Sequence, residues 1–506
     1  MVTTSLNAPT SHYLLTAELS QEIDRKTIGE MQFDGFTLME IAGKSASQLF
    51  LDHYKQLSKG LYLCGKGNNA GDALVFARYL LQNGIKASVV FISGSSDLSE
   101  NTKRNLELLQ KYDHDNTLNV YENWNDAKPI KNFDFIVDGL LGTGLNSNVR
   151  GKYAEAIKWC NKQELPTFAM DIPTGLHPNT GEIMGTALEA NHTFSFGGLK
   201  QGFYLEEGPA LTGKIDYCKL PFPHKYKKNC SNFLLDESWV STDISPTGKH
   251  KYDSGVLYII AGSEGLTGAA IMAAKSAWAE GLGAVILICP RGTLPIYEQT
   301  LPSIIKKPVG NRNDFFFKKE HAEKSLQIIK EKKGSLLLGP GIGRNNSTVE
   351  FVKSILTTNR KPTLIDADGL WCLGQLAKWP KPKGASWVLT PHPGELKQLV
   401  DDKLDSDYQR LQVVQKISNQ QQVTILSKGM PGIIGTLEPK SYLTNYDTSF
   451  FARAGNGDVL AGKVAAYLAL GYSTDKSCAM GLLNGKQKLD QFLRNYKELP
   501  EPTDFI

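Results

Sequence analysis

Short apolar segments along this chain end in glycine-rich or polar turns, and this pattern restricts the fold more than any other feature. The segments alternate with longer stretches of helical periodicity, which is typical of parallel strands joined by helices. In the first half they are LYLC (61–64), FDFIVD (133–138) and PTFAMD (166–171). In the second half they are VLYIIA (256–261), SLLL (335–338), TLID (363–366), SWVL (386–389) and VTIL (423–426). The sequence therefore predicts α/β domains with doubly wound sheets, whose ligands bind where the strands end.

A chain of 506 residues is too long for one hydrophobic core, so we expect more than one domain. The segment PFPHKYKKNCSN (221–232) has two prolines, a basic cluster and neither helical nor strand periodicity. We therefore predict an N-terminal domain over 1–222, a linker over 223–234 and a C-terminal domain over 235–506.

The charge balance and the cysteines exclude several classes of protein. Lys and Arg number 56 against 52 Asp and Glu, a net charge of +4 that is too weak to indicate nucleic-acid binding. The seven cysteines are scattered without a Cys-x-x-Cys pair, which disfavours a zinc site or a disulfide framework. The sequence has neither a secretory leader pattern nor an apolar run long enough to cross a bilayer. We expect a cytoplasmic protein that binds small molecules.

The first glycine-rich site is Gly65-Lys66-Gly67-Asn68-Asn69-Ala70-Gly71-Asp72, which follows strand 61–64 and precedes a helical pattern. Glycines allow close backbone approach, and a helix start favours an anion, so a phosphate could bind there. The alternative is a tight turn in which Asn or Asp caps the helix.

Two further strands of this half end in carboxylates, Asp138 and Asp171. Together with Asn69 and Thr174, Asp138 offers oxygen ligands that suit a hard cation such as potassium better than zinc. The alternative is that Asp138 only ends its strand in a hydrogen-bonded turn.

Residues 13–220 resemble the NAD(P)H-hydrate epimerase family, in which G-x-G-N-N-x-G-D, D-x-L-L-G-T-G and D-I-P-[S/T]-G occur in this order. Ala73 stands where the family often has a third glycine. The resemblance implies K⁺ bound by Asn69, Asp138 and Thr174. It also implies that the hydrated dinucleotide contacts Asn68, Asn69, Ala70, Gly71, Asp72, Gly142, Thr143, Gly144, Leu145, Asn146, Ser147, Asn148 and Asp171. Epimerisation requires an acid and a base, for which Asp72 and Asp171 are the candidate catalytic residues.

In the second half the strongest local signal is Ala454-Gly455-Asn456-Gly457-Asp458, which opens an apolar helical stripe. Backbone amides at this helix start can stabilise a transferring phosphoryl group, and Asp458 can take the proton from an attacking hydroxyl. The alternative is an aspartate that only stabilises its own helix dipole.

Other strand ends of this half add candidate ligands. Gly339-Pro340-Gly341-Ile342-Gly343 leaves backbone accessible, His392 stands between two prolines, and Lys428 begins a glycine turn. A structural histidine and an exposed lysine beside a turn are the alternatives. The small residues of 269–280 are explained by close packing against the sheet.

Residues 235–506 resemble the ADP-dependent NAD(P)H-hydrate dehydratase family, which is similar in fold to the ribokinases. The motifs that carry the resemblance are G-S-x-x-x-T-G-A, G-P-G-[IL]-G, D-A-D-[GA]-L, T-P-H-P-G-E, K-G and G-x-G-D. For the hydrate, it implies the catalytic Asp458 with Ala269, Gly343 and His392. For a nucleotide with Mg²⁺, it implies Lys428, Gly429, Met430, Pro431, Gly432, Thr448, Arg453, Ala454, Gly455, Asn456 and Gly457. Two positions depart from the family pattern, Tyr252 after Lys251 and Asn456 between its glycines.

Together the two resemblances imply a bifunctional enzyme that epimerises the hydrates of NADH and NADPH and dehydrates the S hydrate with ADP or ATP. The substrates are small molecules, and we expect a homo-oligomer without a nucleic-acid or membrane partner. The alternatives are a ribokinase-like small-molecule kinase and a non-catalytic binding or scaffold protein, since fold does not determine function.

Overall fold

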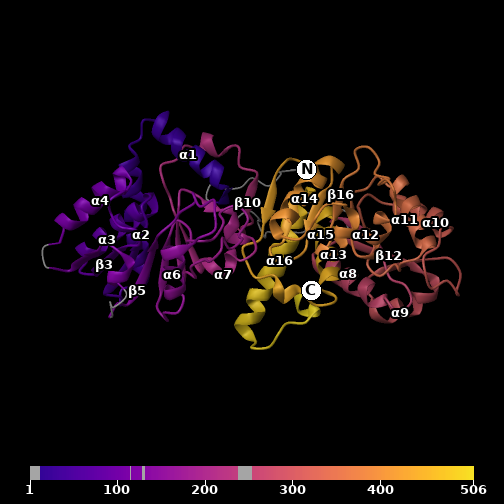
Figure 1. Ribbon diagram of the computed structural model, residues 1–506. Helices are drawn as coiled ribbons and strands as arrows, with labels where there is room; N and C mark the ends of the chain where they lie inside the picture. Colours follow the sequence, from indigo (N-terminus) through magenta and orange to yellow (C-terminus); the bar gives the residue numbers. More distant parts are fainter. Residues whose placement is uncertain (1–11, 114–115, 128–131, 238–253) are drawn as a thin grey trace. The chain divides into compact units, whose positions relative to one another are not determined.

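The computed structural model describes residues 12–113, 116–127, 132–237 and 254–506. These residues form two compact units, an N-terminal unit that ends at Phe233 and a C-terminal unit that begins at Leu234. Figure 1 shows that each unit is a sheet with helices on both sides, which confirms the predicted α/β fold with two domains.

The N-terminal unit contains a seven-stranded parallel sheet in the order β4-β3-β2-β5-β6-β7-β9. Its strands are β2 (Lys59–Cys64), β3 (Lys86–Phe91), β4 (Leu118–Tyr121), β5 (Phe135–Gly139), β6 (Thr167–Met170), β7 (His192–Phe196) and β9 (Lys214–Cys218). Its helices are α1 (Ala17–Gly29), α2 (Gly35–His53), α3 (Asn68–Gln82), α4 (Glu100–Lys111), α5 (Trp124–Ala127), α6 (Gly151–Cys160) and α7 (Gly208–Thr212). The short β1 (Leu14–Leu15) and β8 (Leu199–Lys200) form a separate parallel pair.

Alternating side chains of the strands build two cores, one on each face of this sheet. Tyr62 of β2 packs with α2, α3 and α4, while its neighbours Leu61 and Leu63 pack with α6 on the opposite face. The side-chain period of a strand is two, so β2 to β6 contribute to both cores, whereas β7 and β9 contribute to the first one. Apolar residues on successive strand positions are thereby buried, as in other doubly wound sheets.

The C-terminal unit contains a ten-stranded sheet in the order β10-β19-β18-β17-β16-β15-β14-β11-β12-β13. The strands are β10 (Asn232–Leu234), β11 (Val256–Ile260), β12 (Ala284–Pro290), β13 (Ile305–Val309), β14 (Ser335–Leu338), β15 (Thr363–Ile365), β16 (Trp387–Leu389), β17 (Thr424–Ser427), β18 (Ile433–Gly435) and β19 (Ser441–Leu443). Pairing is parallel from β13 to β17 and antiparallel between β17, β18 and β19.

The helices of this unit are α8 (Thr267–Ala279), α9 (Leu294–Thr300), α10 (His321–Lys330), α11 (Asn346–Thr358), α12 (Asp368–Gly374), α13 (Pro393–Leu399), α14 (Asp407–Gln421), α15 (Asn456–Ala469) and α16 (Thr474–Asn495). The small residues of α8 allow a close approach to α15, since a Cβ atom at Gly462 would lie 2.4 Å from the Ala273 carbonyl oxygen. Ser276 also donates a hydrogen bond to the Val459 carbonyl oxygen at 2.7 Å. Helix packing therefore accounts for this stripe of small residues.

The segment predicted as a linker, 223–234, is a packed part of the fold. It contains the 3₁₀ helix His224–Lys227 and leads into β10. Tyr226 and Cys230 are buried against Leu15 and Ile23 of the N-terminal unit. The prolines and the basic cluster suggested an exposed connection, but the aromatic and sulfur side chains between them bury enough apolar surface to order it.

Among the described residues, none of the helices combines the length and the apolar character that are needed to cross a membrane.

Strand order places one switch point in each sheet. The loops after β2 and β5 leave neighbouring strands in opposite directions along the N-terminal sheet, and those after β11 and β14 do so in the C-terminal sheet. Ligands of open α/β sheets bind in the crevice at such a point. The two candidate sites are therefore expected at these loops.

Candidate active sites

A cavity of about 700 Å³ lies at the switch point of the N-terminal sheet. Its walls come from α1, α2, the start of α3, the loop after β5 and the end of β6. The expected hydrate residues that line it are Asn68, Asn69, Asp72, Gly142, Thr143, Gly144, Leu145, Asn146, Ser147, Asn148 and Asp171.

Glycine at position 65 brings the loops after β2 and β5 together. A Cβ atom at Gly65 would lie 2.0 Å from the Leu140 carbonyl oxygen, far inside van der Waals contact. The Gly65 amide also donates a hydrogen bond to the Gly139 carbonyl oxygen at 3.0 Å. The glycine loop is therefore joined to the neighbouring strand end before α3 begins at Asn68.

Ala70 and Gly71 were expected to contact the ligand, but neither faces the cavity. Ala70 is fully buried in the core, and a Cβ atom at Gly71 would lie 2.4 Å from the Met39 sulfur of α2. Neither residue lines the cavity, because this face of α3 packs against α2. They set the position of α3, whereas Asn68, Asn69 and Asp72 face the cavity.

A group of charged side chains meets in this cavity. Asp171 forms an ion pair with Lys200 and accepts a hydrogen bond from the Phe196 amide at 2.9 Å. Its backbone has a φ of +64°, an uncommon conformation for a non-glycine residue that points to a functional position. Burial and repulsion from Asp171 and Asp24 raise the pKa of Asp72 well above its usual range. Asp72 therefore keeps its proton to a higher pH than an exposed aspartate does.

Sequence reasoning missed Asp24 and Lys200. Asp24 lies on α1 and lines the cavity, and burial with repulsion from Asp171 raises its pKa to about 6. Asp24 as a whole residue is exposed, and it lines this cavity. Neither residue belongs to a glycine-rich motif, so no local signal marks them, and only the fold brings α1 and β8 to this site.

Asp138 and Thr174 lie in direct contact beneath the cavity. Asp138 Oδ1 accepts a hydrogen bond from the Thr174 hydroxyl at 2.7 Å, and Oδ2 accepts one from the Thr174 amide at 2.7 Å. Asp138 also accepts a hydrogen bond from the Leu140 amide at 3.1 Å, as the turn alternative requires. Burial nevertheless raises the pKa of Asp138 to about 6. Among the described residues, no cationic side chain forms an ion pair with this buried carboxyl group.

Asn69 is buried, and its side-chain oxygen and nitrogen have no hydrogen-bond partner among the described residues. A buried amide without partners costs free energy, which indicates an unfilled interaction. Its oxygen, together with Asp138 and Thr174, makes a donor set that fits a hard monovalent cation.

A second cavity, of about 400 Å³, lies in the C-terminal unit. The expected residues that line it are His392, Lys428, Gly429, Gly432, Thr448, Arg453, Asn456 and Gly457. Met430, Pro431, Ala454, Gly455 and Asp458 belong to the same loops but do not line this cavity. The Pro431 carbonyl oxygen instead accepts a hydrogen bond from Arg410 at 2.7 Å, which holds the loop after β17.

The glycine loop before α15 turns at Gly455, whose φ of +97° favours glycine. Helix α15 begins at Asn456, so Asp458 lies in its first turn, as the dipole alternative also requires. The Asn456 side chain is buried and its polar atoms have no partner among the described residues.

Lys428 lies among carboxylates at the strand ends. Its ammonium group is 2.8 Å from Asp366 Oδ1 and 3.7 Å from Glu395 Oε2. Burial alone would lower the pKa of Lys428, but these carboxylates outweigh it and the pKa is raised. Burial and repulsion from Asp366 raise the pKa of Asp458 to about 7, although Lys428 acts in the opposite direction. Asp366 and Glu395 were part of the quoted motifs but were not predicted as site residues.

His392 caps α13 and also faces the cavity. Its Nδ1 accepts hydrogen bonds from the amides of Gly394 at 3.0 Å and Glu395 at 3.3 Å, which leaves Nε2 as the donor. Since its side chain is 55% exposed, Nε2 can bind a ligand. The structural interpretation is therefore confirmed, and binding of a ligand by His392 stays a prediction.

Ala269 and Gly343 lie at the switch point of the C-terminal sheet. A Cβ atom at Gly341 would lie 3.2 Å from the Ala269 Cβ, so the loop after β14 touches the start of α8. The Gly343 amide donates a hydrogen bond to Asp368 Oδ2 at 3.0 Å. Tyr252 and its preceding Lys251, which depart from the family pattern, lie outside the described residues.

The two cavities define a two-domain α/β enzyme with a separate candidate site in each unit. Family models match the units separately, the YjeF-related protein N-terminus over residues 35–202 and NAD(P)H-hydrate dehydratase over residues 257–500. The bifunctional NAD(P)H-hydrate repair enzyme Nnr of Salinibacter ruber is 32% identical over 95% of this chain and 92% of its own length. The enzyme of the same name from Moorella thermoacetica is 30% identical over 93% of this chain and 90% of its own length. This chain belongs to the family of bifunctional NAD(P)H-hydrate repair enzymes.

The raised pKa of Asp458 in the second site can be tested directly. We expect the Asp458 carboxyl group to titrate near pH 7, because burial and Asp366 raise its pKa to about 7. The substitution Lys428→Met removes the charge that lowers this pKa, so the midpoint should move upward. Carbon-13 NMR of labelled aspartate carboxyl groups measures it, with Asp458→Asn assigning the signal.

The matched control is Lys440→Met, since Lys440 is exposed and pairs with Glu438. It should leave the midpoint unchanged. A midpoint near pH 4, or one that Lys428→Met does not move, contradicts the assignment of this carboxyl environment.

Proposed function

We propose that this chain repairs hydrated NADH and NADPH in two steps, one in each unit. The N-terminal unit interconverts the R and S hydrates, and the C-terminal unit dehydrates the S hydrate with ADP or ATP. The observation that carries the proposal is that each candidate site combines a helix start bordered by glycine with a carboxyl group whose pKa is raised. These groups are Asp72, which lines the first cavity, and Asp458, which lies in the helix turn beside the second. The family membership supports both halves together.

Epimerisation needs a proton donor and stabilisation of positive charge. In the hydrated ring the hydroxyl carbon adjoins the ring nitrogen, so loss of the hydroxyl as water leaves a nitrogen-stabilised cation. Water then adds to either face and returns a proton to the protein. The reaction is an isomerisation and consumes no co-substrate.

The two aspartates divide these tasks. Asp72, whose pKa is raised by burial, delivers the proton that converts the leaving hydroxyl to water and takes it back on re-addition. Asp171, oriented by Lys200 and the Phe196 amide, presents an oxygen to the developing cation. Asn68 and the loop from Gly142 to Asn148 bind the rest of the dinucleotide at the cavity wall.

Asp171→Asn should slow epimerisation by about 10²-fold or more, because it removes the anion beside the ring cation. Chromatographic separation of the two hydrates over time measures this rate without dehydration. The control is dehydration of pure S hydrate by the same variant, which should proceed at the normal rate. Full epimerisation by Asp171→Asn would move this role to another residue.

A potassium ion fits the site formed by Asn69, Asp138 and Thr174. The uncompensated buried carboxyl group of Asp138 and the unpartnered amide of Asn69 support this proposal. When bound, the ion would supply positive charge beneath the glycine loop. Asp138 and Thr174 keep the ends of β5 and β6 together through their hydrogen bonds.

Potassium should stabilise the N-terminal unit against heat, and Asn69→Ala should remove this effect. Asn69 is the cleanest change because its side chain makes no hydrogen bond that the substitution would break. A ligand at about a hundred times its Kd stabilises the folded state by about 2.7 kcal/mol. Thermal unfolding in KCl and in NaCl of equal concentration measures the difference.

The response should also weaken below pH 6, because the Asp138 carboxylate, whose pKa is raised to about 6, then becomes protonated. Asn68→Ala, next to this site in the chain, serves as the control and should keep the potassium response. An equal response in wild type and Asn69→Ala would refute the cation site.

Dehydration proceeds by phosphoryl transfer followed by elimination. Asp458 takes the proton of the ring hydroxyl group while the hydroxyl oxygen attacks the terminal phosphorus of the nucleotide. The bond between this phosphorus and the bridging oxygen breaks, and the shortened nucleotide leaves. Phosphate then leaves with the ring oxygen, and loss of a proton from the adjacent ring carbon restores the reduced nicotinamide. A pKa of about 7 suits Asp458 as a general base near neutral pH.

Backbone amides at the start of α15 and the Lys428 ammonium group hold the nucleotide phosphates. Nucleotides carry Mg²⁺, which supplies neutralising charge on the phosphates. The carboxylates Asp366 and Glu395 fit such a cation, since the Lys428 ammonium group already lies between them. His392 Nε2 and the Gly343 turn bind the hydrate.

Asp458→Asn should lose dehydration by about 10²-fold or more while epimerisation stays intact, because only the C-terminal site loses its base. The assay supplies mixed R and S hydrates with Mg²⁺ and either ADP or ATP, and follows recovery of reduced-nicotinamide absorbance. Comparing ADP with ATP also determines the phosphoryl donor. Recovery at the wild-type rate by Asp458→Asn would exclude this aspartate as the base.

A further inference from the structure

The C-terminal segment (500–506) forms part of the second cavity, although the dehydratase family model ends at residue 500. Phe505, in the 3₁₀ helix η7 (Pro502–Phe505), lines the cavity and is 2% exposed. Its ring centroid lies 4.8 Å from that of Phe451, which also lines the cavity and is half-buried. Phe505 therefore packs against the ring of Phe451.

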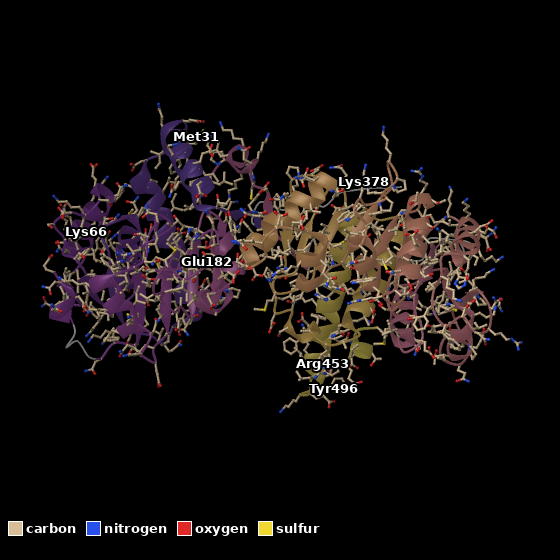
Figure 2. All side chains as sticks on the ribbon, turned by 45° about the vertical axis from the view of Figure 1, so that its right-hand side comes forward. Met31, Lys66, Glu182, Lys378, Arg453 and Tyr496 are labelled. Carbon is tan, nitrogen blue, oxygen red and sulfur yellow. The ribbon has the colours of Figure 1, made fainter. Side chains whose placement is uncertain are left out.

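The same segment contacts the glycine loop that begins α15. Arg453 Nη1 donates a hydrogen bond to the Pro500 carbonyl oxygen at 3.0 Å. A Cβ atom at Gly455 would lie 3.3 Å from Pro502 Cγ, so the proline ring lies against this turn. Figure 2 shows the Arg453 side chain at the surface of the C-terminal unit. The segment is thus attached to the loop at two points.

The cavity has Lys428 beside the start of α15, its cationic end, and aromatic rings beside α16, its aromatic end, while Arg453 and Lys463 line it as well. At the start of α15, a Cβ atom at Gly457 would lie 3.5 Å from the Lys428 ammonium nitrogen. On α16, a Cβ atom at Gly485 would lie 3.4 Å from the Phe451 ring. Among the described residues, no aspartate or glutamate lines the cavity, and Tyr446 adds a third aromatic ring. Phosphates suit the first end and a nucleobase suits the second.

We propose that Phe451 forms the surface on which the nucleobase packs, and that Phe505 of the C-terminal segment is the positioning residue that holds it there. The inference rests on the proposed nucleotide role of this cavity. Every nucleobase can stack on an aromatic ring, so the Phe451 ring contributes affinity without selecting a particular base through hydrogen bonds.

The test compares a ligand with a base to one without. Binding of ATP and of inorganic tripolyphosphate, each with Mg²⁺, is measured by calorimetry on the full chain without hydrate. Phe505→Ala and Phe451→Ala should each weaken ATP binding about tenfold, within the range expected for lost base stacking. Tripolyphosphate binding should stay within about twofold, because it does not reach the aromatic end. Phe505→Leu should recover part of the ATP affinity.

Thr503→Ala is the matched control, since Thr503 is exposed on the same segment. It should bind both ligands like the wild type. Normal epimerisation by every variant confirms that equal amounts of folded chain are compared. If Phe505→Ala does not fold, Phe451→Ala tests the same base contact, because its ring is half-buried rather than in the core.

Equal loss of ATP and tripolyphosphate binding would overturn the inference, since the segment would then act on the phosphate loop alone. Unchanged ATP binding in Phe451→Ala would also overturn it. Failure of the proposed function looks different, because the wild type would then bind neither ligand or would leave the hydrates unchanged with every nucleotide.

Discussion

Close backbone approach at the switch points is the constraint on which both sites depend. Gly65 lets the loop after β2 touch the Leu140 carbonyl group, and Gly341 lets the loop after β14 approach the loop after β11, where its Cβ atom would lie 2.6 Å from the Leu266 carbonyl oxygen. Any side chain would separate these loops. With them in contact, the carboxyl ends of neighbouring strands meet within each unit, beside Asp138 in the N-terminal sheet and beside Asp366 in the C-terminal sheet.

Burial then raises the pKa of carboxyl groups at both candidate sites. The pKa of Asp458 is raised to about 7 and that of Asp72 well above its usual range, in both cases first by burial and then by neighbouring carboxylates. Each site limits this effect with one buried lysine, Lys200 or Lys428. The pairing of a lysine with a carboxylate next to the working aspartate recurs in the two units, although their sheets differ in order and in strand number.

Much of the fold and of the sites could be predicted, because the signals are local. Strand ends such as Cys64, Asp138 and Leu338 are followed by glycine turns, and the motifs named Asp72 and Asp171, which face the first cavity. The predicted linker, 223–234, contains the step from one unit to the other at Phe233 and Leu234, but its prolines and lysines hid the burial of Tyr226 and Cys230. The assignment of Ala70 and Gly71 to ligand contact did not anticipate that α2 covers their face of α3.

The sequence by itself determined the α/β class, the order of the motifs and the residues at the helix starts, because turns and helix starts depend on neighbours in the chain. The tertiary structure alone decided that Asp24 and Lys200 join the first site, that Lys428 lies between Asp366 and Glu395, and that Phe505 supports Phe451. These contacts join segments far apart in the chain. Their positions, and the pKa shifts that follow from burial, exist only once the sheets and helices have packed.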